Sequence, residues 1–153
     1  LFLKEGGDPE VNPGGEFGAD CFHCHGEAGL QFSDYLFHNN GLDSSFENDP
    51  GRVNVTGFVL DSGLFKTPTL RNVAVSAPYM HDGRFVSLEE VVEHYNSGGH
   101  MSSTVDPLMK NIGDGLLLSP EDKQALIAFL RTLTDEEFLN NSQEISHLHQ
   151  IYK

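Results

Sequence analysis

Two cysteines and a histidine stand close together near the start of the chain. Cys21, Cys24 and His25 form a C-x-x-C-H motif, and the 153 residues contain no further cysteine. Two thiols about one helical turn apart can each add to a vinyl group of a haem, and the adjacent imidazole can then bind the iron as proximal ligand. The motif therefore predicts one covalently attached haem c.

Two other kinds of site would use the same side chains. A zinc or copper ion could be bound by Cys21 and Cys24 together with His23 and His25. Structural zinc sites usually take a second ligand pair at regular spacing, and no second cysteine pair exists. A redox-active dithiol is expected in a βαβ context, which this sequence does not predict. We therefore favour haem attachment, which implies maturation outside the cytoplasm and a periplasmic or other extracytoplasmic location.

The sixth coordination position of such an iron has several candidate ligands. The chain contains Met80, Met101 and Met109, besides Tyr95 and the remaining histidines. Many single-haem cytochromes use a methionine well downstream of the attachment motif, which favours Met80. Tyr95 lies on the apolar face of a predicted helix, where packing in the core is the ordinary role of a tyrosine. The residues alone leave this choice open.

Helices separated by long loops must hold these residues in place. A helix is predicted over residues 87–96, because Ser87 and Glu90 have the spacing of a capping box and an apolar stripe follows. A second helix is predicted over 119–132, with Ser119 as cap and Pro120 in the first position. A short third helix is expected after Thr134 as cap, and a fourth near the C-x-x-C-H motif.

The remaining segments are predicted as loops. Residues 4–20 and 39–63 are rich in Gly and Asp, apart from a possible short strand over 53–60. These patterns predict a mainly α protein with a c-type cytochrome fold and long loops. We expect one haem domain over residues 1–139, followed by a polar tail over 140–153.

The charge balance excludes some classes of partner. The chain has 9 basic and 23 acidic residues, which gives a formal net charge of −14. This argues against nucleic-acid binding and against docking on anionic lipid. No apolar run approaches the ~20 residues of a membrane span. An acidic surface could steer a basic electron donor toward the haem edge or simply keep the protein soluble, and both interpretations stay open.

A series of segments downstream of the motif resembles one known family. The segments are FHNNGL at 37–42, FKTPTLRNV at 65–73, APYMHDG at 77–83, SLEEVVEHYNSGG at 87–99 and the closing helix around 126–133. In this order they resemble the C-terminal haem domain of bacterial di-haem cytochrome c peroxidases and their MauG-like relatives. The resemblance runs from about Cys21 to Leu139, so it covers most of the chain.

The resemblance implies a role in electron transfer. In that family an N-terminal haem meets peroxide, and the C-terminal haem receives electrons from a small redox protein and passes electrons or oxidising equivalents on. With one attachment motif, this chain is expected to be the C-terminal half of an oxidoreductase. A second haem domain would then lie on the same polypeptide or on a partner chain. The alternatives are a free-standing mono-haem carrier without peroxidase activity and a MauG-like enzyme that oxidises a protein side chain.

The resemblance also implies a choice of sixth ligand. Peroxidase members of the family have a methionine 14 residues after the histidine of a His-Asp-Gly turn, and MauG-like members have a tyrosine there. The corresponding histidine here is His81, and Tyr95 lies 14 residues after it. The resemblance therefore implies that Tyr95 is the distal ligand of the iron, with Met80 as the alternative.

Further cofactor-binding residues follow from the same resemblance. Pro68 and Leu70 are expected to line the haem face. Arg71 is a candidate partner of a haem propionate, because a guanidinium matches a carboxylate in a two-pronged way, or else it makes a surface ion pair. His81 would lie on a haem-side turn, where it couples the haem to its surroundings or serves as a structural residue of the turn.

An interdomain calcium ion is also implied. Two-domain members of the family often bind calcium with backbone oxygens near the Ala-Pro-Tyr segment, which corresponds here to Ser76 and Pro78. The other half of such a site would lie in the second haem domain.

Overall fold

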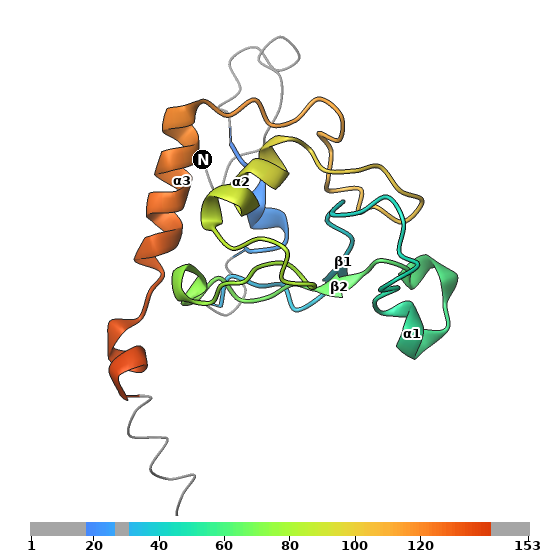
Figure 1. Cartoon of the computed structure of the whole chain (residues 1–153), viewed down its shortest axis with the longest axis horizontal. Helices are drawn as coiled ribbons and strands as arrows, with labels where there is room; N and C mark the ends of the chain where they lie inside the picture. The colour runs from blue at the N-terminus through green and yellow to red at the C-terminus, as the bar shows by residue number, and fades with distance from the viewer. Residues whose placement is uncertain (1–17, 27–30, 142–153) are drawn as a thin grey trace, which may run out of the picture.

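The structure is mainly helical with long loops, as predicted. The computed structural model describes residues 18–26 and 31–141. Along the chain it contains the 3₁₀ helix η1 (Cys21–His23), β1 (Phe37–His38), α1 (Val53–Thr56), η3 (Val59–Asp61), β2 (Phe65–Lys66), η4 (Val73–Val75), α2 (Leu88–Asn96) and α3 (Pro120–Thr132). Residues 136–141 form one more helical segment at the end of the described chain (Figure 1).

The capping box predicted at Ser87 and the cap predicted at Ser119 are both present. The Ser87 hydroxyl accepts a hydrogen bond from the backbone N–H of Glu90 (3.3 Å), and the Glu90 carboxylate accepts one from the N–H of Ser87 (3.0 Å). At the start of α3, Ser119 and Asp122 make the same reciprocal pair, and Pro120 occupies the first helical position. These bonds satisfy N–H groups that a helix terminus otherwise leaves without partners. The start of each helix is therefore confirmed.

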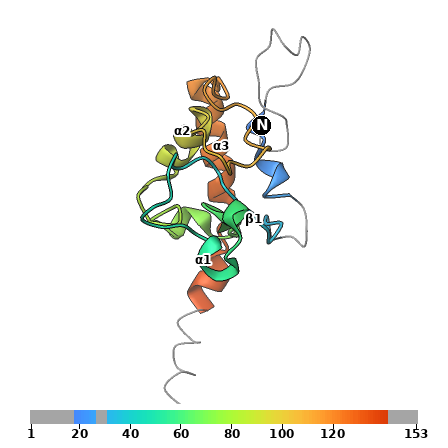
Figure 2. The same ribbon diagram turned by 90° about the vertical axis from the view of Figure 1, so that its right-hand side faces the viewer.

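The hydrophobic core lies between α2 and α3. The two helices pack against each other, and a loop over 116–118 closes the core beside them (Figures 1 and 2). Ala19 also belongs to the core, so the segment that leads into η1 is fastened directly to the helical body. The buried members of the cluster are Ala19, Leu88, Val92, Leu116, Leu118, Leu126, Ile127, Leu130 and Leu133.

The strand predicted over 53–60 is wrong. That segment forms α1 and η3 instead, and α1 ends at Gly57, which has a left-handed φ of 68° and donates its N–H to Val53. Val55, Phe58 and Val59 stay exposed rather than pairing in a sheet. β-branched residues favour strands only where a partner strand offers packing, and this segment meets none in the described chain. The small antiparallel sheet instead pairs β1 with β2.

The two short helices that the sequence predicted differ from the structure in detail. The cap of the short third helix is Asp135 and not Thr134, because the Asp135 carboxylate accepts from the N–H of Phe138 (2.9 Å) while the N–H of Thr134 closes the end of α3. The helix expected near the motif is the short η1. The predicted loop over 4–17 and most of the predicted tail, 142–153, lie outside the described residues.

No helix in the described part of the chain is long and apolar enough to cross a membrane.

Removing the N-cap of α2 should lower stability. We expect Ser87→Ala to reduce the free energy of unfolding by about 1 kcal/mol, because the N–H of Glu90 loses its acceptor. Urea unfolding followed by circular dichroism would measure this. Ser44→Ala, at an exposed serine, is the matched control. Equal stabilities of the two variants would contradict the capping assignment.

Candidate functional site

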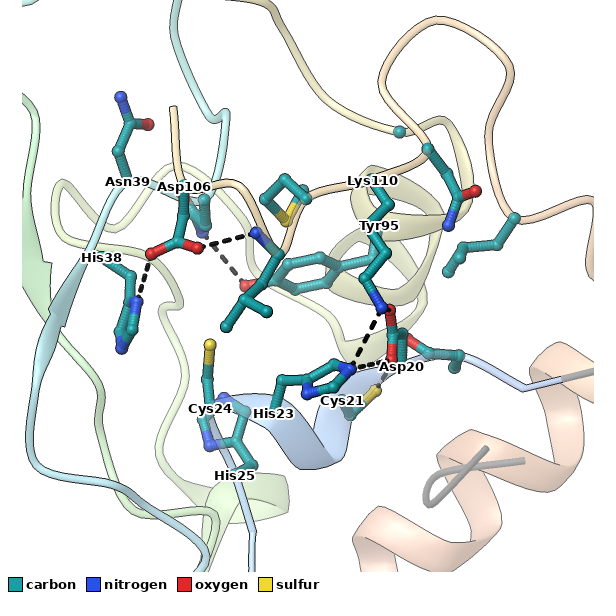
Figure 3. A pocket seen from close by; sticks show the side chains of 17 residues that line it. Asp20, Cys21, His23, Cys24, His25, His38, Asn39, Tyr95, Asp106 and Lys110 are labelled. Carbon is teal, nitrogen blue, oxygen red and sulfur yellow. Dashed lines mark hydrogen bonds and ion pairs between the residues drawn. The ribbon is translucent and has the colours of Figure 1, made fainter. Parts of the chain in front are cut away.

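The C-x-x-C-H motif and α2 face the same cavity. Cys21, Cys24 and His25 line one side, and Tyr95 reaches in from α2 on the other (Figure 3). The cavity holds about 690 Å³ of space, a figure that includes its open mouth. Its wall includes Ala19, Leu108, Met109 and Leu116, so much of it is apolar.

His25 is prepared to act as a metal ligand. Its Nδ1 lies 2.8 Å from the carbonyl oxygen of Phe32, to which an Nδ1–H donates. Such a bond fixes the tautomer and leaves Nε2 for a metal. Burial lowers the pKa of His25, although the carbonyl groups of Phe32 and Pro68 act in the opposite direction. The imidazole is therefore neutral at physiological pH, as a ligand must be.

Residues 32–34 are fastened to the motif on one side and to α3 on the other. The N–H of Asp34 donates to the carbonyl of Cys24 (2.9 Å), and the ring of Phe32 meets the ring of Phe129 on α3 edge-on, with centroids 6.4 Å apart. Phe32 has a left-handed φ of 51°. The carbonyl of Phe32 therefore binds His25, while its ring packs against α3.

The two cysteines do not have the character of a redox dithiol. Both are free thiols, and burial, together with nearby carboxylates, raises the pKa of Cys21 and of Cys24 to about 12. Reactive dithiols need a lowered pKa, because the thiolate is the nucleophile. The zinc or copper set that the sequence allowed is not brought together either. Among the described residues, the one group with metal-ligand spacing is Cys24, Asp34 and His38.

Tyr95 forms the opposite wall. Its hydroxyl oxygen accepts a hydrogen bond from the side-chain amide of Asn40 (3.1 Å). Burial raises the pKa of Tyr95 to about 12, although the bond from Asn40 lowers it. The side chain is thus a neutral phenol at pH 7 unless a positive charge lies beside it. A ferric iron would supply that charge.

Close backbone contacts fix the helix end that carries Tyr95. A Cβ at Gly98 would lie 2.2 Å from the carbonyl oxygen of Asn111, and one at Gly115 would lie 2.4 Å from that of Asn96. Both glycines also have positive φ angles. Neither position has room for a side chain, so the loop over 111–116 packs tightly on the end of α2.

The three methionines differ in their placement. Met109 lines the cavity, and Met101 is 66% exposed. Met80 is partly buried, and its sulfur lies 3.5 Å from the amide nitrogen of Asn40, next to Tyr95. Met80 is not among the residues that line the cavity.

Other residues named from the resemblance lie around the site rather than in the cavity wall. The Pro68 carbonyl favours the protonated form of His25 and so raises its pKa, against the effect of burial. Leu70 packs against the core. The Arg71 guanidinium lies 5.7 Å from the centre of the Phe32 ring, on the proximal side. The ring of His81 contacts Phe65 edge-on, with centroids 3.7 Å apart. Their roles toward a haem remain predictions.

The segment predicted to hold calcium lies on the surface. Ser76 and Pro78 are exposed, and the Ser76 hydroxyl donates to the carbonyl of Val73 (3.0 Å).

His38 lines the cavity beside Cys24, and the sequence included it only among the remaining histidines that could supply a sixth ligand. Its Nδ1 lies 2.5 Å from Asp106 and its Nε2 lies 2.7 Å from Asp34. Burial alone would lower the pKa of His38. The two neighbouring carboxylates have the larger combined effect, so the pKa is raised. Both ring nitrogens are therefore engaged as donors, which leaves neither for a metal. The only signal in the sequence was that His38 belongs to the FHNNGL segment.

A second polar cluster lies at the cavity beside Cys21. Asp20 is 2.8 Å from Nε2 of His23 and 3.6 Å from the ammonium group of Lys110. Figure 3 shows the three side chains meeting above the motif. Lys110 therefore brings positive charge to the cavity from a loop far along the chain, which no pattern near the motif indicated.

A family model described as cytochrome c matches residues 15–134. The chain belongs to the cytochrome c family. Membership implies a covalently bound haem c, and the residues that line the cavity fit it: two thiols, a neutral imidazole with its second nitrogen held, and an apolar wall. This agrees with the covalent haem c that the C-x-x-C-H motif predicts.

Several relatives indicate the branch of this family. The chain is 43% identical over 148 residues to the cytochrome-c peroxidase IdrP1 of a Pseudomonas species, covering 78% of this chain and 38% of the relative. It is 35% identical over 118 residues to the methylamine utilization protein MauG of Methylorubrum extorquens, covering 77% and 32%. These support the di-haem cytochrome c peroxidase and MauG-like branch.

A solved structure agrees. The crystal structure of a MauG-like protein associated with microbial copper homeostasis superposes with a TM-score of 0.67 at 36% identity, over 77% of this chain and 43% of that one. The chain thus spans about a third to two fifths of the length of the relatives it matches.

The link between Asp34, His38 and Asp106 should make stability depend on pH. The carboxylates raise the pKa of His38 in the folded state above its ordinary 6.5. The stability that the charged His38 gives to the fold is therefore complete below the ordinary pKa, and it is lost as pH rises through the pKa of the folded state. We expect the difference in unfolding free energy between wild type and His38→Gln to be largest near about pH 6 and to shrink at higher pH.

Urea titrations of the haem-loaded protein at several pH values would measure this difference. His100→Gln, at an exposed histidine, is the control. A difference for His38→Gln that does not vary with pH would contradict the assignment.

Proposed function

We propose that this chain is the haem c electron-transfer domain of a di-haem cytochrome c peroxidase-like or MauG-like oxidoreductase. It would pass electrons or oxidising equivalents to or from a second haem, on the same polypeptide or on a partner chain. The observation that carries the proposal is the convergence of Cys21, Cys24, His25 and Tyr95 on one cavity. The peroxidase and MauG relatives support the same assignment.

In this proposal each residue has a separate task. Cys21 and Cys24 would hold the haem through thioether bonds, and His25 and Tyr95 would supply ligands to its iron. The bound haem supplies one-electron chemistry, with a potential that its axial ligands adjust across about 0.8 V. A phenolate is hard and anionic, so Tyr95 would favour ferric iron and a low potential, whereas the thioether of Met80 would do the opposite.

The proposal extends to the surroundings of the domain. An extracytoplasmic location follows from haem c attachment, and a small basic redox protein suits a chain with a net charge of −14. An interdomain calcium ion at Ser76 and Pro78 would take its other ligands from the second haem domain. Because this sequence has one C-x-x-C-H motif, a free-standing electron carrier is the second candidate.

Haem content and peroxide turnover test the assignment. The chain, produced in a host that attaches haem c, should carry one haem that survives acid extraction. Alone, it should not turn over hydrogen peroxide with a reduced cytochrome above the rate of free haem. Rapid turnover by the single chain would contradict a pure electron-transfer role. A second C-x-x-C-H motif encoded upstream of Leu1 would exclude the free-standing carrier.

Substitution of the distal side chain tests the ligand. Tyr95→Phe should abolish the phenolate-to-iron charge-transfer absorption of the ferric protein and raise the reduction potential, because an anionic ligand is lost. Tyr79→Phe is the matched control, since the Tyr79 hydroxyl donates to the carbonyl of Val73 and Tyr79 does not line the cavity. Met80→Leu should retain the phenolate absorption. Ferric spectra of Tyr95→Phe identical to those of wild type would refute Tyr95 as ligand.

A further inference from the structure

The side-chain amide of Asn40 lies between the two candidate distal ligands. Its Nδ2 is 3.1 Å from the hydroxyl oxygen of Tyr95 and 3.5 Å from the sulfur of Met80. A thioether can only accept, so the contact with Met80 orients the amide with its NH₂ group, and not its oxygen, toward both neighbours. Asn40 therefore donates to Tyr95, and the phenol oxygen is the acceptor.

Several contacts hold Asn40 in this position. Nε2 of His94, which is buried on α2, donates to the backbone carbonyl of Asn40 (3.1 Å). The turn that carries Met80 is fastened to the same region, because the Arg84 guanidinium makes two hydrogen bonds to Asp43 (2.9 and 2.6 Å). The donor and both acceptors thus belong to segments that are fixed relative to one another.

The hydrogen bond leaves Tyr95 free to bind a metal. Among the described residues, the one hydrogen bond found at the Tyr95 oxygen is the one that Asn40 donates. The phenolic proton therefore has no protein acceptor in that part of the chain. Asn40 is also one of the residues that line the cavity. A donor at this position stabilises negative charge on the oxygen, as it would on a phenolate bound to iron.

We propose that Asn40 is a positioning residue that sets the reduction potential of the haem through its hydrogen bond to Tyr95, with Met80 orienting the amide. This rests on the proposed function, in which Tyr95 ligates the iron. A donated hydrogen bond draws electron density away from the phenolate and weakens its preference for ferric iron. Asn40 thus holds the potential above that of an unassisted phenolate haem.

The experiment uses haem-loaded protein and has two readouts, the reduction potential and the charge-transfer absorption. A purely structural role of Asn40 would change neither. In Asn40→Leu the reduction potential should fall, and the phenolate-to-iron charge-transfer band should shift to lower energy, because the phenolate becomes a stronger donor. Asn54→Leu, at an exposed asparagine on α1, is the matched control and should change neither readout. If Asn40→Leu does not fold, Asn40→Ala removes the donor with a smaller side chain and should shift both readouts in the same direction.

The outcomes separate this inference from the proposed function. A lower melting temperature of the Asn40 variants with an unchanged potential and band would overturn the role of Asn40, even if Tyr95→Phe loses the band. If wild type itself shows no phenolate band, the ligand assignment fails, and the inference fails with it.

Discussion

The hydrogen bond between His25 and the carbonyl of Phe32 is the constraint on which the rest of the site depends. It fixes the imidazole in one tautomer, and it fixes the ring relative to the two cysteines that precede it. Phe32 can serve this purpose because its own ring is packed against Phe129 on α3. The proximal side of the site is therefore tied to the helical core.

Burial acts on both sides of the cavity and prepares them for a metal in opposite ways. It lowers the pKa of His25, so the imidazole is already the neutral form that a metal requires. It raises the pKa of Tyr95, so the phenolate forms only where a positive charge compensates it. The proximal ligand is thus ready before the haem is bound, whereas the distal ligand depends on the iron.

Local patterns predicted the parts of the molecule that depend on neighbouring residues. The C-x-x-C-H motif, the capping box at Ser87 and the cap at Ser119 involve residues within a few positions of each other, and all are present. The supposed strand over 53–60 failed because its side chains meet no partner strand among the described residues. The sequence did not indicate the contacts of Asn40 with Tyr95 or of His38 with Asp106, because these partners lie 55 and 68 positions away and only the fold brings them together.

The central claim is that Tyr95, from α2, completes the coordination of a haem held by Cys21, Cys24 and His25. Resonance Raman spectroscopy of the ferric haem-loaded wild type tests it most directly. Excitation in the charge-transfer region should enhance the vibrations of an iron-bound phenolate. Absence of those vibrations, together with the far-red charge-transfer band of a sulfur-ligated iron, would contradict the account and point to a methionine instead.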